Sequence, residues 1–177
     1  PKLGGTKTVN VAALRALRPT HVIVNIDENE RALADELAAC VPHLVVTHPL
    51  APFDNLALYR LLGGIFGRRR AAESLCARFQ AAHAAIARER FAERSTLYLI
   101  WKDPWMTVSR DTYISRTLAL AGLNTLPEEG GARYPEIFLD APWIAQAELV
   151  LLSSEPYRFR ARHVAARPQA ERGRAAA

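Results

Sequence analysis

Seven consecutive residues, Trp101-Lys102-Asp103-Pro104-Trp105-Met106-Thr107, combine two indoles, a thioether, a lysine and an acid. They follow the apolar segment 96–101, which predicts a buried strand. Ligands of open α/β sheets bind beyond the carboxyl ends of the strands, and aromatic faces provide contact area at little cost in rotamer entropy. We therefore expect Trp101, Asp103 and Trp105 to bind a large, flat, partly apolar ligand. The alternative is that the two indoles only close the edge of the core.

A second polar and aromatic stretch, residues 153–159, follows the apolar segment 149–152 in the same way. Its Glu155 and Tyr157 would line the same site, and Tyr134, which follows two glycines, would join them. The alternative is a turn whose aromatic side chains pack on the sheet.

Catalytic and metal-binding motifs are absent from the sequence. It has no GxSxG, P-loop or GxGxxG segment, and its five histidines and two cysteines have no metal-ligand spacing. We expect no cofactor, and Cys40 and Cys76 as free thiols. The alternative function is a small α/β enzyme acting on a nucleotide or phosphorylated substrate, with Asp103 and Glu155 as acid and base.

The formal charge of +5 arises at the carboxyl end of the chain. Residues 158–177 hold six arginines and one acid, and the rest of the chain has equal numbers of basic and acidic residues. A neutral body does not gather nucleic acid, so we expect no nucleic-acid partner and a solvated tail. No apolar run is long enough to span a bilayer, and the first 30 residues show no signal-peptide pattern.

The first part of the chain alternates strand and helix patterns. Residues 21–25 and 43–47 read as buried strands, separated by a helix over 31–39. Asn10 is a good N-cap for a preceding helix. The acids of 27–30 are most simply explained as an N-cap and first-turn residues that favour the helix dipole.

A helix pattern from Asp54 through Leu62 follows, with Gly63, Gly64 and Gly67 marking its end. Residues 68–93 contain no Gly or Pro and repeat apolar side chains at helical spacing. At 1.5 Å per residue such a helix would span about 39 Å, more than one small lobe needs, which favours a connector.

Strand and helix patterns then resume with a helix over 111–121 and a short helix near 141–147. The prediction is an α/β fold with two small Rossmann-like lobes, mainly parallel sheets and one long backbone helix. Its parts are an N-terminal lobe over 1–67, the connecting helix over 68–93, a C-terminal lobe over 94–163 and a disordered tail over 164–177.

Four segments carry a family resemblance: the Gly-Gly-Thr-Lys of 4–7, the LRPTHVIVN segment from Leu17, WKDPWMTVSRDTYIS from Trp101 and SSEPYRF from Ser153. With the order of lobe, helix and lobe, they resemble the helical-backbone (class III) periplasmic substrate-binding proteins of ABC importers. Among these the sequence looks most similar to cobalamin and iron-chelate receptors. The resemblance covers about residues 2–163.

The resemblance implies a monomeric, non-enzymatic receptor in the periplasm or another extracytoplasmic space. Such a receptor captures a corrinoid, ferric siderophore or haem chelate in the cleft between its lobes and delivers it to an ABC transporter permease without inserting in the membrane. Trp101, Trp105, Tyr157 and Glu155 would face the ligand. Glu30 matches the position of the first-lobe acid that pairs with permease arginines.

The sequence departs from the family pattern at both ends. The family normally opens with a further strand and helix and closes with another strand and helix, so this sequence resembles a truncated member. Without these strands, the backbone groups at the sheet edges would be unpaired.

Overall fold

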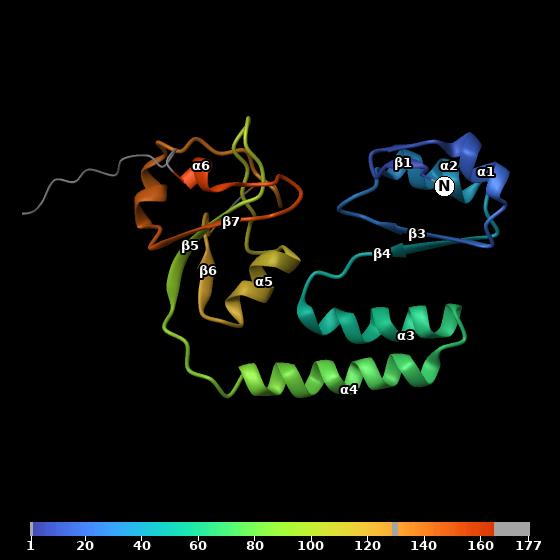
Figure 1. Ribbon diagram of the computed structural model, residues 1–177, viewed down its shortest axis with the longest axis horizontal. Coiled ribbons are helices and arrows are strands. Elements are labelled where there is room, and N and C mark those ends of the chain that lie inside the picture. The colour runs from blue at the N-terminus through green and yellow to red at the C-terminus, as the bar shows by residue number, and fades with distance from the viewer. Residues whose placement is uncertain (1, 129–130, 165–177) are drawn as a thin grey trace, which may run out of the picture. The chain divides into compact units, whose positions relative to one another are not determined.

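The computed structural model describes residues 2–128 and 131–164 (Figure 1). Two compact units make up the chain, Pro1–Pro49 and the part that begins at Leu50. Residues 50–67, expected in the N-terminal lobe, belong to the second unit. The predicted tail lies outside the described residues apart from Val164.

The first unit is a small α/β layer. Its elements are β1 (Gly4–Gly5), β2 (Thr8–Val9), α1 (Val11–Leu17), β3 (His21–Asn25), α2 (Arg31–Ala38) and β4 (His43–Thr47). The short strands β1 and β2 form an antiparallel hairpin that the sequence did not predict, whereas β3 and β4 pair in parallel over all five residues. The core joins Leu14 of α1, Val24 of β3, Leu37 of α2 and Val41, which precedes β4. The ends of both predicted strands are confirmed, but the expected burial is wrong, because Ile23 and Val46 are 43% and 52% exposed.

Of the two helix starts predicted in this unit, that of α1 is confirmed and that of α2 is not. Asn10 caps α1, with its Oδ1 accepting the Ala13 N–H at 2.9 Å. The expectation for the acids of 27–30 is wrong, because α2 has no acid in its first turn and its N-cap Glu30 makes no side-chain cap bond. The loop is held instead by Asn25 and Asn29, whose side chains accept the N–H groups of Asp27 and Asn25.

A helical hairpin opens the second unit. The 3-10 turn η1 (Pro52–Asp54) leads into α3 (Asn55–Ile65), which packs against α4 (Arg69–Ile86). Gly63 and Gly64 lie inside α3, so only Gly67 marks its end, with a φ of 63°. Gly63 is buried against α4, where a larger residue would meet Ala72.

The predicted helix over 68–93 is shorter than expected. The helix α4 has 18 residues and ends at Ile86, which corresponds to about 27 Å. Every side chain from 84 to 94 is exposed, so the continuing pattern has no buried face to stabilise further turns. The chain instead turns at residues 87–89 and enters the sheet.

A parallel three-stranded sheet with the order β6-β5-β7 forms the rest of the second unit. Its elements are β5 (Arg94–Leu99), α5 (Tyr113–Ala119), β6 (Leu123–Thr125), η2 (Pro142–Gln146), β7 (Leu149–Leu152) and α6 (Ala161–Val164). Leu97, Leu99 and Ile137 form its core. The strand β6 was not predicted, and the segments expected over 96–101 and 111–121 are β5 and α5 with shifted ends.

Three further findings concern the described residues. None of their helices is long and apolar enough to cross a bilayer. Cys40 and Cys76 are both free thiols. No group of three or more His, Cys, Asp or Glu side chains in this part of the chain could hold a metal ion.

Candidate functional site

The Trp-Lys-Asp-Pro-Trp-Met stretch forms a tight hairpin directly after β5. Trp101 and Met106 pair as an antiparallel bridge, with the Met106 N–H donating to the Trp101 carbonyl at 3.2 Å. Asp103 turns the chain with a φ of 62°, a left-handed conformation that Asp tolerates better than most residues. The hairpin therefore holds its two indoles at the carboxyl end of the central strand.

Lys102 contacts both an acid and an indole of this hairpin. Its Nζ lies 2.6 Å from Oδ2 of Asp103 and 5.6 Å from the centre of the Trp105 ring. The hydrogen bond that the Lys102 ammonium donates to the Asp103 carboxylate raises the pKa of Lys102 above its usual value. Asp103, which we expected to face a ligand, thus has a carboxylate already engaged by a cation.

A second segment, residues 133–137, runs antiparallel beside this hairpin and its continuation. The N–H of Ser109 donates to the Arg133 carbonyl, that of Thr107 to Pro135, and that of Ile137 to Trp105. These bonds place Tyr134 next to the Met106–Ser109 segment, although the two are far apart in sequence. Tyr134 is one of the predicted site residues, and the structure brings it to the same end of the sheet as the indoles.

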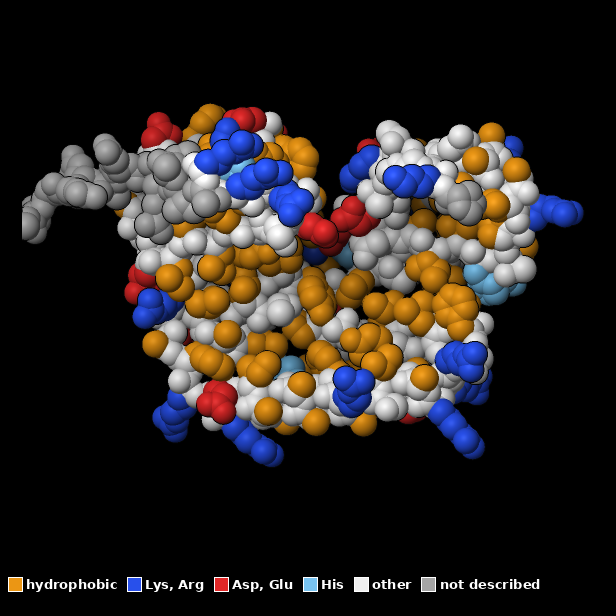
Figure 2. All heavy atoms as spheres, in the orientation of Figure 1, with side chains coloured by type: hydrophobic (Ala, Val, Ile, Leu, Met, Phe, Trp, Pro, Cys, Tyr) orange, Lys and Arg blue, Asp and Glu red, His pale blue; other side chains and the backbone are white. Residues whose placement is uncertain are grey.

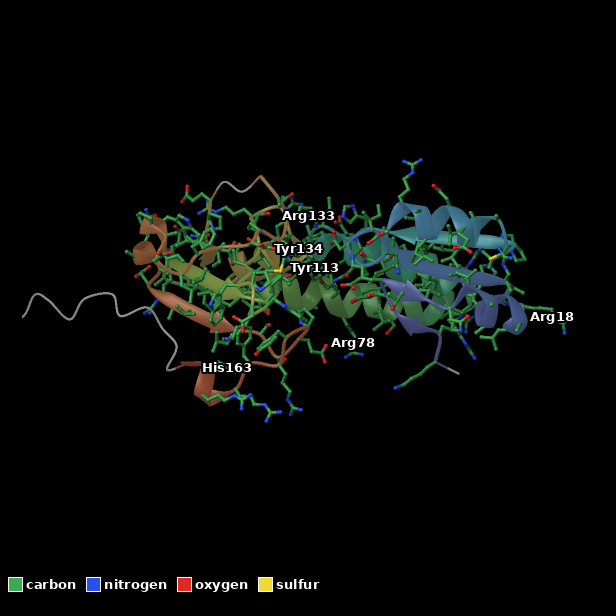
Figure 3. The ribbon with its side chains drawn as sticks, turned by 90° about the horizontal axis from the view of Figure 1, so that it is seen from above. Arg18, Arg78, Tyr113, Arg133, Tyr134 and His163 are labelled. Atoms are coloured by element: carbon green, nitrogen blue, oxygen red, sulfur yellow. The ribbon has the colours of Figure 1, made fainter. Side chains whose placement is uncertain are left out.

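The surroundings of Tyr134 add residues that the sequence did not single out. The guanidinium of Arg133 lies over its ring at 5.8 Å, and Arg133 Nε is 3.7 Å from Asp111 Oδ2. Figure 3 shows Arg133, Tyr134 and Tyr113 close to one another, with His163 apart from them. The Tyr113 hydroxyl accepts a hydrogen bond from Asn55 Nδ2 at 2.7 Å, which fixes its ring on α5.

The rings of the two predicted stretches form one aromatic cluster. Trp101 meets Tyr157 edge-on with centroids 5.5 Å apart, and Trp105 stacks on Phe159 at 6.0 Å. Tyr157 and Phe159 lie 4.7 Å apart, and His163 packs within 6 Å of both. The stretches beyond β5 and β7 therefore meet, as predicted from their positions after neighbouring strands.

Burial separates the two indoles. Trp105 and Phe159 pack on the core of Leu97, Leu99 and Ile137, as the core-edge alternative proposed, whereas Trp101 is 39% exposed. Burial and the nearby charges of Arg162 and Lys102 lower the pKa of the His163 imidazole. Trp101 is thus the indole with the most surface to offer a ligand.

The two acids outside this cluster are exposed. Glu155 lies in the turn after β7, and Glu30 stands at the start of α2 with no side-chain cap bond. In the loop before α2, Asp27 Oδ1 lies 3.4 Å from His48 Nε2, and Glu28 accepts a hydrogen bond from Thr6.

Buried hydroxyls fix the backbone beneath the site. Thr107 donates to the Tyr98 carbonyl at 2.7 Å, and Ser115 and Thr125 share a hydrogen bond of 2.5 Å between α5 and β6. The Thr112 side chain accepts the Ser115 N–H and caps α5. Their signal in the sequence is the density of Ser and Thr between 107 and 117.

Comparisons with known proteins give matches among solved structures alone. No family model and no curated protein matches the sequence. The periplasmic vitamin B12 binding protein BtuF of Vibrio cholerae superposes with a TM-score of 0.75 at 15% identity, over 86% of this chain and 60% of that one. The periplasmic heme-binding protein RhuT from Roseiflexus sp. RS-1 gives 0.71 at 23% identity, also over 86% and 60%. IsdE of S. aureus, solved with heme, gives 0.65 at 18% identity over 81% and 57%.

The chain thus spans about 60% of the length of these proteins. The predicted fold class, α/β with mainly parallel sheets, is confirmed, and the resemblance seen in the sequence agrees with the structures found. At these identities the likeness establishes the fold alone, which this chain shares with these binding proteins.

Proposed function

We propose that this chain belongs to an extracytoplasmic receptor that binds a metal chelate for an ABC importer. The chelate is a corrinoid, a haem or a ferric siderophore. The observation that carries the proposal is the aromatic cluster beyond β5 and β7, in a fold shared with binding proteins for vitamin B12 and heme. The three solved structures named above are binding proteins, which favours a receptor over the enzyme alternative with Asp103 and Glu155.

Binding by this cluster needs no catalytic group. A flat ligand would lie against the exposed face of Trp101 and the edge of Tyr157, gaining dispersion and burying apolar area. Tyr134 and Glu155 would contribute polar contacts that orient it. The metal would arrive within the ligand, so the chain supplies shape and stacking.

Tryptophan fluorescence tests this directly, because the chain has three tryptophans and two of them lie in the hairpin. The chain is titrated with cyanocobalamin, haemin and a ferric tris(hydroxamate), with correction for absorbance. We expect saturable quenching by one of them at micromolar concentration. The affinity should be about 2- to 10-fold weaker in Trp101→Ala, since aromatic stacking contributes about 0.5–1.5 kcal/mol.

Trp143→Phe is the matched control. Trp143 lies in η2 and packs on the core of the second unit, so its loss should leave the quenching intact. Trp101 is preferred to Trp105 for the test, because Trp105 also packs on that core. A folded chain that none of the three chelates quenches would overturn the proposal.

We further propose that Glu30 contacts the permease. Glu30 is exposed at the start of α2, and its side chain makes no capping hydrogen bond to the helix. Glu30→Arg should leave chelate quenching unchanged and abolish capture of the receptor by its permease. Glu36→Arg, an exposed acid on the same helix, is the control and should leave both intact.

A further inference from the structure

The turn between α3 and α4 has a fixed backbone and an unusual surface. The Arg68 N–H donates to the Gly63 carbonyl at 2.7 Å and the Gly67 N–H to Gly64 at 3.3 Å, which is the Schellman arrangement. Gly67 supplies the positive φ that this arrangement requires. The sequence of the turn and the first residues of α4 is Phe66-Gly67-Arg68-Arg69-Arg70, referred to below as the basic turn.

The arginines of the basic turn have no acid to balance them. Residues 55–80 contain five arginines and one acid, Glu73. Both oxygens of Glu73 are taken by Arg60, at 2.8 and 3.1 Å. Arg68, Arg69 and Arg70 are exposed and form no ion pair with a described residue. Figure 2 shows Lys and Arg side chains gathered at the end of the α3 and α4 hairpin where this turn lies.

Folding does not explain these three cations. They stand at the amino end of an 18-residue helix, where the partial positive charge of the helix dipole disfavours them. The first turn of α4 holds no acid, and Arg68 makes no side-chain cap bond. Three positive charges at this position cost helix stability, and an external anion would offset that cost.

The same turn exposes an aromatic side chain. Phe66 follows α3 and is 61% exposed, although a ring of this size is usually buried. Arginines bind phosphate groups through paired N–H donors, and an aromatic ring inserts at the boundary of headgroups and acyl chains. Basic residues next to an exposed aromatic are thus the composition that fits a membrane surface rather than a dissolved ion.

We propose that the basic turn docks on anionic phospholipid headgroups, with the three arginines on the phosphates and Phe66 at the interface. The inference goes beyond chelate binding and does not depend on which chelate is bound. It would hold the receptor at the surface of a membrane that contains its transporter. An acidic segment of another protein is the competing partner, and the experiment separates the two.

Vesicle sedimentation tests the proposal with the whole 177-residue chain. One set of vesicles is pure phosphatidylcholine and the other contains phosphatidylglycerol, each at low and at physiological salt. We expect binding to the anionic vesicles only, weakened by salt. Each arginine near an anionic surface contributes about five-fold in partitioning, so Arg68→Gln/Arg69→Gln/Arg70→Gln should lose about 100-fold.

Two variants make the result specific. Arg78→Gln/Arg88→Gln/Arg90→Gln removes the same charge from the middle of α4 and from the segment that follows it, and should bind almost as wild type does. Phe66→Ala should weaken binding about ten-fold even at salt concentrations that screen the arginines. Removing cations from the amino end of α4 should not lower its stability, so the triple variant will remain folded, which circular dichroism checks.

Several outcomes would overturn the proposal. These are equal binding to both vesicle types, equal loss in the two triple variants, and binding that survives in the basic-turn variant through another stretch such as 158–174. Displacement from anionic vesicles by an acidic peptide at equal charge concentration would favour a protein partner and also overturn it.

Discussion

The contact between Gly63 of α3 and Ala72 of α4 gives a sharp test of how the helical hairpin is packed. A Cβ atom on Gly63 would lie 2.4 Å from the Ala72 Cβ and 3.3 Å from the Arg68 carbonyl oxygen. Real Cβ atoms essentially never come within 3.0 Å of another heavy atom, so Gly63→Ala must push the helices apart. Gly64, the next residue of the same helix, has no neighbour within 4 Å of such a Cβ.

The magnitude follows from two opposing contributions. Replacing a helical Gly by Ala stabilises a helix by about 1 kcal/mol. Overpacking a close contact costs about 1–3 kcal/mol. Gly64→Ala should therefore raise the free energy of unfolding by up to about 1 kcal/mol, and Gly63→Ala should lower it by up to about 2 kcal/mol. Because the propensity gain is common to both variants, their difference measures the overpacking cost alone.

Urea unfolding followed by tryptophan fluorescence is the appropriate assay. Trp101, Trp105 and Trp143 all lie in the second unit, so the signal reports the unit that contains the hairpin and is insensitive to the first. The double variant Gly63→Ala/Ala72→Gly removes the clashing methyl group and should recover stability relative to the sum of the single changes. Equal stabilities of Gly63→Ala and Gly64→Ala would refute the close approach of α3 to α4.

Two further predictions concern polar pairs in the second unit. Ser115→Ala leaves the buried Thr125 hydroxyl without its 2.5 Å partner and should lower the free energy of unfolding in urea by about 1–3 kcal/mol. The double variant Ser115→Ala/Thr125→Val should lose less than the sum of the two single changes. Strict additivity would show that the two hydroxyls are not coupled. The hydrogen bond from Arg60 holds the pKa of Glu73 below its usual 4.5, so the pair stabilises the fold at neutral pH and loses this effect as the pH falls from about 4.5 through the lower folded value. Glu73→Gln should be slightly less stable than wild type at pH 7 and equal to it below that window, and a difference that grows on acidification would contradict the assignment.

Local sequence was enough to predict the elements whose pattern is complete within a few residues. The strands β3 and β4 are β-branched runs bounded by Pro, Asn and Asp, and their predicted ends match the structure. The N-cap at Asn10 was also predictable, because capping is a contact between a side chain and an amide three residues away. The position of the Trp-rich hairpin followed from the strand before it, since ligand sites lie beyond the carboxyl ends of such strands.

Elements that depend on distant partners were missed or misplaced. The strand β6 has three residues, too few for a periodic signal, and exists because β5 offers an unpaired edge. The helix α4 stops at Ile86 for lack of a buried face, although its sequence pattern continues. Gly63 suggested a helix end in the sequence, yet the structure uses it for close packing against Ala72.

The candidate site shows the same division. The sequence by itself determined which residues stand after β5 and β7 and that two indoles, a tyrosine and two acids are among them. Only the tertiary structure decided that Trp101 keeps an exposed face while Trp105 packs on the core, and that Asp103 is held by Lys102. It also brought Tyr134 beside the hairpin through backbone bonds across nearly thirty residues. The physical reason is that side-chain type and the order of elements along the chain can be read from the local sequence, whereas burial and strand pairing depend on which distant segment packs against a residue.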